Sequence, residues 1–362
     1  MTEQLNQLLE GTPLSALVKP GQKIALLEHN MTVGDALSVL AKNDILSAPL
    51  VMQADLEDSG DINMSPSLLG WLDIQDILAA LLLFLRTCGH EIPMKMLALM
   101  TSLEKEGPKF AKKTLVTIRA ADDRGLMYQA DSESTSVLTA IKDLFLQTAH
   151  GEPKVAHRIA LFNAHGEVTS IISQMDVARW LLTQEAHMGP VAQKSIRELG
   201  MLTGKPPVVS VSPHMPTLMA YDLMAQEGVS GAPVVTDEGE LIANISVSDL
   251  RALTSEHFGV LALPVAEFLA LEHNTAYIGY SVNASDHSKH PFFASSKRTG
   301  GTKKNDIQLY TLHPTSTLLQ TLHAFVDTHI HRLYVTTPGS DVLKVESVLT
   351  LTDVLRLLAG VW

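Results

Sequence analysis

The sequence predicts an α+β fold built from four copies of one strand–turn–helix unit. A five-residue motif with Asp in fourth place recurs along the chain at residues 173–177, 246–250 and 350–354, with a weaker copy at 73–77. An apolar run typical of a strand precedes each copy, and an apolar segment with helical spacing follows it. Because internal repeats determine the architecture of such chains, the fold follows from this unit.

The elements on either side of the motif follow in chain order. The predicted strands include residues 68–69, 171–172, 241–243 and 348–349. The predicted helices include residues 77–85, 177–182, 250–253 and 354–358.

The unit also extends upstream of the motif. Pro233 lies 16 residues before Asp249, and Ala160 lies 16 residues before Asp176. Pro216 lies a further 17 residues before Pro233, and apolar positions with helical spacing lie between them. The unit therefore reads helix, strand, hairpin, strand, helix. At about 60 residues it is too large for a solenoid repeat and small for an independent domain.

The chain divides accordingly into repeats and connecting segments. The predicted order is repeat 1 at 15–86, a helical connector at 87–110, repeat 2 at 111–187, repeat 3 at 194–257, a flexible insertion at 281–306 and repeat 4 at 307–360. Within the repeats, the polar stretches 53–66 and 120–133 predict solvated loops. The insertion is rich in Ser, Gly, Lys and His and lacks the spacing of a phosphate-binding loop, which favours a disordered surface segment.

Composition narrows the class of protein. The 362 residues are long enough for two compact domains of two repeats each, and 46% of them are hydrophobic, enough for a sizeable core. A net charge of −12 argues against nucleic acid and anionic membranes as partners. The single cysteine, Cys88, allows no internal disulfide. The longest apolar run, residues 77–85, is far shorter than the ~20 residues of a membrane-spanning helix, and the first residues lack the features of a signal peptide.

An acidic residue stands at the start of every predicted helix of the motif, and this pattern has two interpretations. Ser or Thr followed three residues later by Asp is a helix-start signature, worth about 1 kcal/mol for the cap. A carboxylate at a helix start that faces a cleft between paired repeats can also accept both hydroxyls of a ribose. The residues concerned are Asp76, Asp176, Asp249 and Asp353, with the hydroxyls of Ser173, Ser246 and Thr350. In the first copy Asp73 replaces the hydroxyl, and a second carboxylate there would repel phosphate.

Two His-Arg pairs occupy the same place in repeats 2 and 4. They are His157-Arg158 and His331-Arg332. An isolated pair on a strand is most often surface decoration, whereas the alternation between repeats indicates a duplicated pair of repeats with a shared centre. A guanidinium presents a planar fork of donors that suits phosphate oxygens, and a histidine adds a donor. We therefore expect at least one pair to bind phosphate.

These motifs together resemble those of the CBS (cystathionine-beta-synthase-type) repeat family. The segments 45–50 and 229–235 match the family's first and third repeats, and the two His-Arg pairs fall in its second and fourth. Among four-repeat proteins, the chain resembles the gamma subunit of AMP-activated or sucrose-non-fermenting-type protein kinase. The resemblance implies four β-α-β-β-α repeats, arranged as two tandem pairs (Bateman modules) in a disc-like, pseudo-symmetric assembly. It also implies that the repeated aspartates bind ribose and that the His-Arg pairs contact the phosphates of AMP, ADP or ATP.

The first hypothesis is therefore a non-catalytic regulatory subunit. Its expected partners are a protein kinase catalytic subunit and a scaffolding, beta-type subunit, and its expected location is the cytoplasm, with the nucleus as a second compartment. A rival hypothesis is a four-repeat scaffold that binds protein partners without nucleotide. A third, the regulatory half of an enzyme, leaves too little chain for a catalytic domain. No covalent cofactor, metal site or catalytic motif is expected, because the chain has no Walker or kinase signature and His329 and His331 lack a third ligand at metal-like spacing. Other adenosyl ligands, such as S-adenosylmethionine, also suit such clefts, and only the resemblance argues against them.

Overall fold

The computed structural model describes residues 3–52, 67–90, 95–118, 126–129, 133–148, 155–163, 167–251, 253–273, 309–336 and 343–361. The predicted loops at 53–66 and 281–306 lie outside these ranges.

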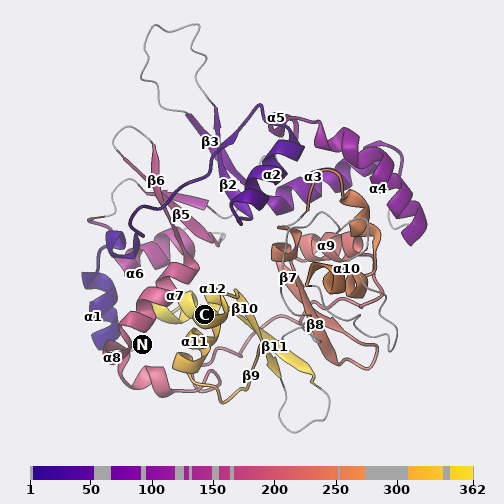
Figure 1. The fold of residues 1–362 in the computed structure, drawn as a ribbon. Coiled ribbons are helices and arrows are strands. Elements are labelled where there is room, and N and C mark those ends of the chain that lie inside the picture. Colours follow the sequence, from indigo (N-terminus) through magenta and orange to yellow (C-terminus); the bar gives the residue numbers. More distant parts are fainter. Residues whose placement is uncertain are drawn as a thin grey trace, which may run out of the picture.

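Four repeats follow one another along the chain, and each follows the same path (Figure 1). Repeat 1 comprises β1 (Leu27–Glu28), α2 (Val33–Lys42), β2 (Ser47–Met52), β3 (Ser67–Asp73) and α3 (Ile74–Thr87). Repeat 2 comprises β4 (Leu126–Gln129), α6 (Val137–Thr139) with η2 (Ala140–Phe145), β5 (Arg158–Phe162), β6 (Val168–Ser173) and α7 (Gln174–Thr183). Repeat 3 comprises α9 (Thr217–Gln226), β7 (Gly231–Val235), β8 (Leu241–Ser246) and η4 (Val247–Leu250). Repeat 4 comprises β9 (Thr311–Leu312), α11 (Leu318–Thr328), β10 (Arg332–Thr336), β11 (Val345–Thr350) and α12 (Leu351–Ala359).

Short helical segments lead into each repeat. They are α1 (Glu3–Gly11) and η1 (Leu14–Leu17) before repeat 1, and α4 (Met96–Ala111) and α5 (Leu115–Ile118) before repeat 2. Before repeat 3 lie α8 (Glu185–Met188) and η3 (Gly189–Gln193), and before repeat 4 lie η5 (Phe258–Ala262) and α10 (Val265–Glu272). No described helix is long and apolar enough to span a bilayer.

Each repeat has the same sheet topology, which confirms the predicted fold class. The first strand pairs in parallel with the second, and the second pairs antiparallel with the third, in the sheets β1-β2-β3, β4-β5-β6 and β9-β10-β11. In repeat 3 the first strand is reduced to a single parallel bridge between Val211 and Val234. Every hairpin also shifts its register at the same place, near the end of its first strand. The repeat unit therefore begins with a strand. The unit predicted from the sequence pattern began with the helix that follows this strand.

Two details differ from the sequence prediction. The polar stretch 120–133 was expected to be a loop, yet it contains β4, whose Leu126 and Met127 pair with Arg158 and Ile159. Tertiary pairing outweighs the weak strand propensity of that stretch. The helix expected at 250–253 is instead the short 3-10 turn η4, which ends at Leu250.

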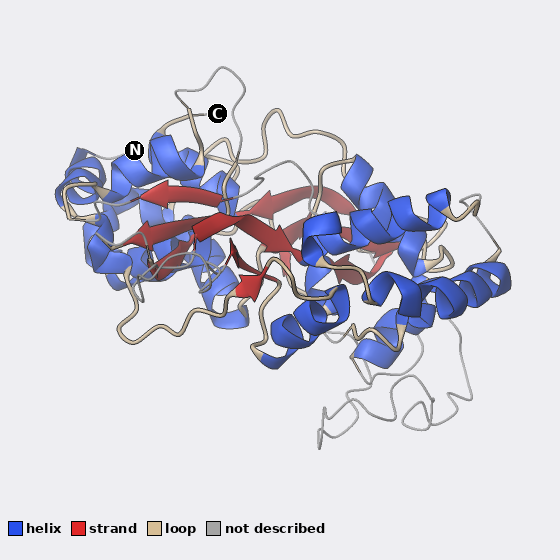
Figure 2. Ribbon diagram, turned by 90° about the horizontal axis from the view of Figure 1, so that it is seen from above, coloured by secondary structure: helices blue, strands red, loops and turns tan. Residues whose placement is uncertain are grey.

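Two hydrophobic cores hold the repeats together. One core contains apolar side chains of repeats 1 and 3 with α4, and the other contains those of repeats 2 and 4 with α1. The sheets make the remaining contacts: Trp71 of repeat 1 packs on Ala160 of repeat 2, and the Leu241 amide of repeat 3 donates to the Leu343 carbonyl of repeat 4 at 2.7 Å. The two repeats of each tandem pair thus contact each other through their sheets, and the two pairs pack against each other through their helices. Figure 2 shows the strands in a band through the middle of the disc and helices gathered at both ends.

Candidate functional site

The four repeated aspartates all lie at the third position of their helices and close a capping box with the residue that precedes the helix, as the helix-start interpretation requires. One oxygen, Oδ2, accepts the backbone N–H of the residue three positions earlier in each copy. The distances are 2.8 Å for Asp76, 2.9 Å for Asp176, 2.7 Å for Asp249 and 2.8 Å for Asp353. This leaves Oδ1 as the atom that distinguishes a plain cap from a ligand-binding carboxylate.

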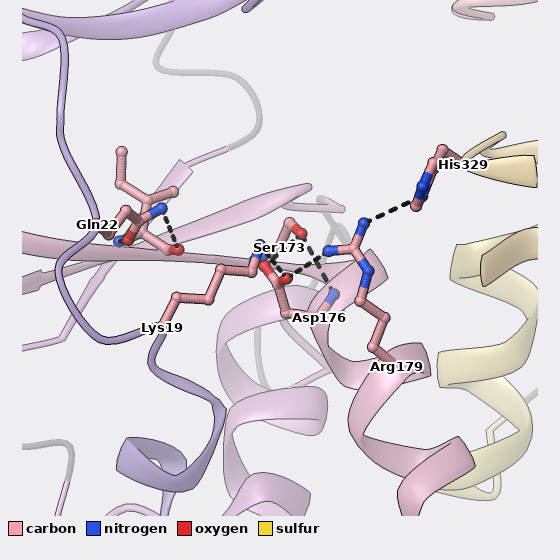
Figure 3. A network of polar contacts seen from close by, with 7 residues as sticks. Lys19, Gln22, Ser173, Asp176, Arg179 and His329 are labelled. Carbon is pink, nitrogen blue, oxygen red and sulfur yellow. Dashed lines mark hydrogen bonds and ion pairs between the residues drawn. The ribbon is translucent and has the colours of Figure 1, made fainter. Parts of the chain in front are cut away.

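In repeat 2 that second oxygen is held by two cations (Figure 3). Asp176 Oδ1 lies 2.6 Å from Lys19 Nζ and 3.0 Å from the Arg179 guanidinium. Lys19 comes from the segment before β1, and Gln22 fixes this segment to β6. The Gln22 side-chain oxygen accepts the Ile171 N–H at 2.8 Å, and the Gln22 side-chain nitrogen donates to the Ile171 carbonyl at 3.2 Å. Burial alone would raise the pKa of Asp176, but hydrogen bonds from Lys19 and Ser173 outweigh it and hold the pKa below its usual range.

Repeat 4 reproduces this arrangement, and repeat 3 does not. Asp353 Oδ1 forms an ion pair with Lys205, which comes from the segment before repeat 3, and lies 3.9 Å from Arg356. Asp353 is only 3% exposed and Lys205 only 19%, so this pair is nearly buried. In repeat 3, Asp249 Oδ1 has His273 Nε2 at 3.5 Å.

The predicted nucleotide-binding hydroxyls are part of the caps. Ser173 Oγ donates to Asp176 Oδ2 at 2.7 Å, and Thr350 Oγ1 donates to Asp353 Oδ2 at 2.8 Å. Ser246 Oγ accepts the Ser248 amide at 3.2 Å. A nucleotide contact from these hydroxyls stays a prediction.

The register of the hairpins places each predicted phosphate-binding arginine directly opposite a cap. Arg158 at the start of β5 pairs with Ser173, and Arg332 at the start of β10 pairs with Thr350. The Arg332 guanidinium then reaches into repeat 3, where it donates to Ser230 Oγ at 2.5 Å. It also lies over Gly231, where an added Cβ would come within 1.7 Å of it. Only glycine fits beneath the arginine.

Arg158 makes the equivalent crossing into repeat 1, but with different partners. Its guanidinium lies over the Trp71 ring, 6.0 Å from the centroid. Burial raises the pKa of Asp73, and the Arg158 charge acts against that rise, which places the two groups within electrostatic reach. Asp73, whose carboxylate we expected to repel phosphate, is therefore close to Arg158, which we expected to bind phosphate.

Positive charge collects where the four repeats meet. Burial lowers the pKa of Arg158 and of Arg332, and within the described residues neither forms an ion pair. Arg251 of repeat 3 adds a third guanidinium, which lies 3.5 Å from the exposed Asp44 and whose buried Nε has no hydrogen-bond partner.

Two histidines complete this central group. Desolvation by the protein around the rings, and then the charges of Arg158 and Arg332, lower the pKa of His157 and of His331 to about 4. Both residues are nevertheless exposed to solvent in the folded chain. Both are therefore neutral at pH 7, and we refer to His157, Arg158, Arg251, His331 and Arg332 as the central cationic group.

Three functional candidates were missed at the sequence level. The sequence contains a pattern that could have revealed Lys19 and Lys205. Each is followed by proline and lies shortly before the first strand position of an odd-numbered repeat. Arg251 had none, because it occurs after one copy of the motif only. No cluster of three His, Cys, Asp or Glu side chains suited to a metal occurs in the described part of the chain.

Comparisons with known proteins agree with this fold. Residues 196–256 and 305–360 match the family model described as the CBS domain. Protein SDS23 of Kluyveromyces lactis is 24% identical over 96% of this chain and 62% of its own length. Protein sds23 of Aspergillus niger is 26% identical over 90% of this chain and 57% of its own. The chain thus spans less than two thirds of these relatives.

A solved structure shows the same overall fold. A protein of Methanocaldococcus jannaschii, described as a proposed archaeal homologue of g-AMPK, superposes with a TM-score of 0.59 over 95% of this chain and 99% of its own. The identity is 16%, so the likeness concerns the fold alone. It confirms the expected four-repeat, disc-like fold.

Proposed function

We propose that this chain, whose residues 196–256 and 305–360 match the CBS domain model and whose fold matches a four-repeat structure, is a non-catalytic regulatory subunit. It binds AMP, ADP or ATP in clefts between its paired repeats and regulates a partner protein kinase. The repeated aspartates hold the ribose, and the central cationic group holds the phosphates.

The central cationic group is the observation that carries this proposal. The carboxylates of Asp73 and Asp249 lie within electrostatic reach of Arg158 and Arg332, respectively, but among the described residues neither arginine forms a direct ion pair. Arg158 and Arg332 lie in partly buried positions without an ion pair among the described residues, while Arg251 has only one exposed carboxylate at 3.5 Å. Buried charge without a partner costs free energy. A phosphate chain supplies the missing negative charge, and the bidentate geometry of guanidinium suits its oxygens. Perturbed groups gathered at one place are typical of binding sites.

The phosphate count gives such a subunit a way to signal. A ligand shifts a conformational equilibrium only through its different affinities for the two states. AMP and ATP carry the same ribose, so they differ mainly in the charge presented to the central cationic group. A kinase and a beta-type scaffold bound to the disc would sense that difference through the contacts between repeats.

Calorimetry with AMP and ATP tests nucleotide binding, and Arg332→Ala tests the assigned role. We expect the wild-type chain to bind at least one nucleotide and Arg332→Ala to lose about tenfold or more in affinity, since a charge-assisted hydrogen bond is worth about 1.5–3 kcal/mol. The exposed Arg197 provides a matched control, Arg197→Ala, which should bind like the wild type. A lower melting temperature without a lower affinity would contradict the phosphate role. S-adenosylmethionine serves as the competing adenosyl ligand.

Affinity purification of the tagged full chain with and without AMP tests the kinase part of the proposal. We expect a protein kinase catalytic chain among the bound proteins, in an amount that depends on AMP. Bound proteins that include no kinase, or do not respond to AMP, would contradict it.

The scaffold hypothesis is the second candidate, and one observation favours it. In repeats 2 and 4 the second oxygen of the aspartate is already held by the chain's own lysine. In a scaffold such ion pairs would only fix the linkers. No heat of binding with any adenine nucleotide would select this candidate.

A further inference from the structure

The two Lys-Pro dipeptides that enter the repeat 2 and repeat 4 sites suggest how those sites choose a ligand, an inference that rests on the proposed function. Lys19-Pro20 precedes the first strand of repeat 1 and reaches the aspartate of repeat 2, while Lys205-Pro206 precedes the first strand position of repeat 3 and reaches the aspartate of repeat 4. The same contact is therefore built twice, across each tandem pair.

These contacts are supported by the structure around them. Proline restricts the residue before it to extended conformations, which limits the directions in which each lysine points. Gln22 bonds both backbone groups of Ile171 and so fixes the first segment to β6 three residues after Lys19 (Figure 3). In the second segment Lys205 is 19% exposed. A lysine of a flexible surface segment would lack such fixing.

The lysine and a ribose need the same atom. Oδ2 of Asp176 and of Asp353 is committed to the helix cap, so Oδ1 is the oxygen left to accept the hydroxyls of a ribose. That oxygen carries Lys19 in one site and Lys205 in the other. A ribose that binds this oxygen therefore competes with the lysine ammonium, and in repeat 2 also with the Arg179 guanidinium at 3.0 Å.

Displacement has a different cost for different ligands. A neutral nucleoside would take the carboxylate oxygen and leave a lysine ammonium without a counter-charge. The cost is larger at Lys205, whose side chain is 19% exposed, than at Lys19, whose side chain is 52% exposed. A nucleotide carries a phosphate on the same ribose, and the long, flexible lysine stem can turn its ammonium toward that phosphate. The exchange then conserves the number of ion pairs.

We propose that Lys19 and Lys205 determine ligand specificity in repeats 2 and 4, where they select phosphorylated adenosine over free adenosine. Among the described residues no lysine forms an ion pair with Asp249 of repeat 3, which faces His273 at 3.5 Å, so the selectivity of that site depends on the central cationic group.

The test measures the affinities of the full chain for adenosine and for AMP by calorimetry, in wild type, Lys19→Met, Lys205→Met and the double variant. Methionine keeps much of the apolar stem and removes the charge. We expect the double variant to bind adenosine more tightly and AMP no more tightly, so that the ratio of the two affinities falls by about tenfold or more. Lys23→Met is the matched control, because Lys23 is exposed on the same segment, and it should leave the ratio unchanged.

The outcomes separate this inference from the proposed function. If the wild-type chain binds AMP and the ratio is the same in the double variant, the lysines do not select the ligand and the inference is wrong. If the wild-type chain binds neither AMP nor ATP, the proposed function fails, and this inference fails with it. Should Lys205→Met not fold, because it removes the partner of a nearly buried carboxylate, Lys19→Met decides alone, since the Lys19 side chain is 52% exposed.

Discussion

At the scale of single residues, the caps make the two tandem pairs unequal. Repeat 1 has Asp73 where repeats 2, 3 and 4 have Ser173, Ser246 and Thr350. All four cap their helices, so helix stability alone does not require the difference. Its effect is electrostatic, because Asp73 adds a carboxylate near Arg158, whereas its equivalent in repeat 3 is the neutral Ser246. Arg332 donates to Ser230 and has the Asp249 carboxylate within electrostatic reach.

Asp73→Ser tests this inequality. Serine is as good a cap as aspartate, so the helix should remain intact while the charge near Arg158 disappears. We expect the affinity for AMP to rise severalfold in calorimetry, since a unit charge a few ångströms away is worth about 1–4 kcal/mol. Asp237→Ser removes the same charge from an exposed turn and serves as the control. Equal effects in both variants would show that only net charge matters.

The histidines of the central cationic group give the stability of the chain a dependence on pH. The pKa of His157 and of His331 is about 4 in the folded chain, below the usual 6.5. As pH falls from about 6.5 to 4 the unfolded chain takes up protons that the folded chain does not, so the free energy of unfolding decreases in that window. Urea denaturation at pH 7 and pH 5 should show this loss, and His157→Gln with His331→Gln should reduce it. An unchanged pH dependence in the double variant would contradict the assignment.

At the scale of elements, strand register decides where side chains meet. Gly231 begins β7, and its equivalent in β2 is Ser47, so the repeat pattern itself does not require glycine. The requirement comes from another repeat, because the Arg332 guanidinium occupies the space of a β-carbon.

Gly231→Ala should therefore displace Arg332. An added Cβ would meet the guanidinium at 1.7 Å and the Ile245 carbonyl oxygen at 2.9 Å, so the side chain must leave and the strand must shift. We expect a loss of nucleotide affinity comparable to that of Arg332→Ala, together with a lower melting temperature. Gly11→Ala is the control, because nothing lies within 4 Å of its added Cβ. Unchanged affinity would show that Arg332 does not act from this position.

The sequence predicted local elements well and contacts between them poorly. The capping signatures located four helix starts, because a cap depends on residues a few positions apart. It did not reveal β4, whose strand state depends on pairing with β5 more than 30 residues later. For the same reason the site was only half predicted. The aspartates and arginines recur with the repeat, whereas Lys19 and Lys205 act on a repeat other than the one they precede.

At the scale of the whole molecule, the cores join repeats that are not neighbours in sequence. Repeat 1 packs with repeat 3, and repeat 2 with repeat 4, so each tandem pair covers the apolar helices of the other. Phe258 of η5, the segment that follows repeat 3, shows this packing between the two tandem pairs. Its ring lies 6.0 Å from that of Phe110 in α4, in an edge-on arrangement, and it covers Gly107, where an added Cβ would come within 2.7 Å.

A chain that ends at residue 187 should therefore be unable to remain a folded monomer. It keeps the sheet contacts between repeats 1 and 2 but exposes the apolar faces of α3, α4 and α7, and apolar patches of that extent are typical of association surfaces. Because the two tandem pairs are pseudo-symmetric, a second copy offers equivalent helices, and a two-fold dimer is the expected product. Size-exclusion chromatography with light scattering, run beside the full chain, gives the mass. A folded, stable monomer of this fragment would mean that each pair is independent, and changes at one pair would then have no packed route to the other.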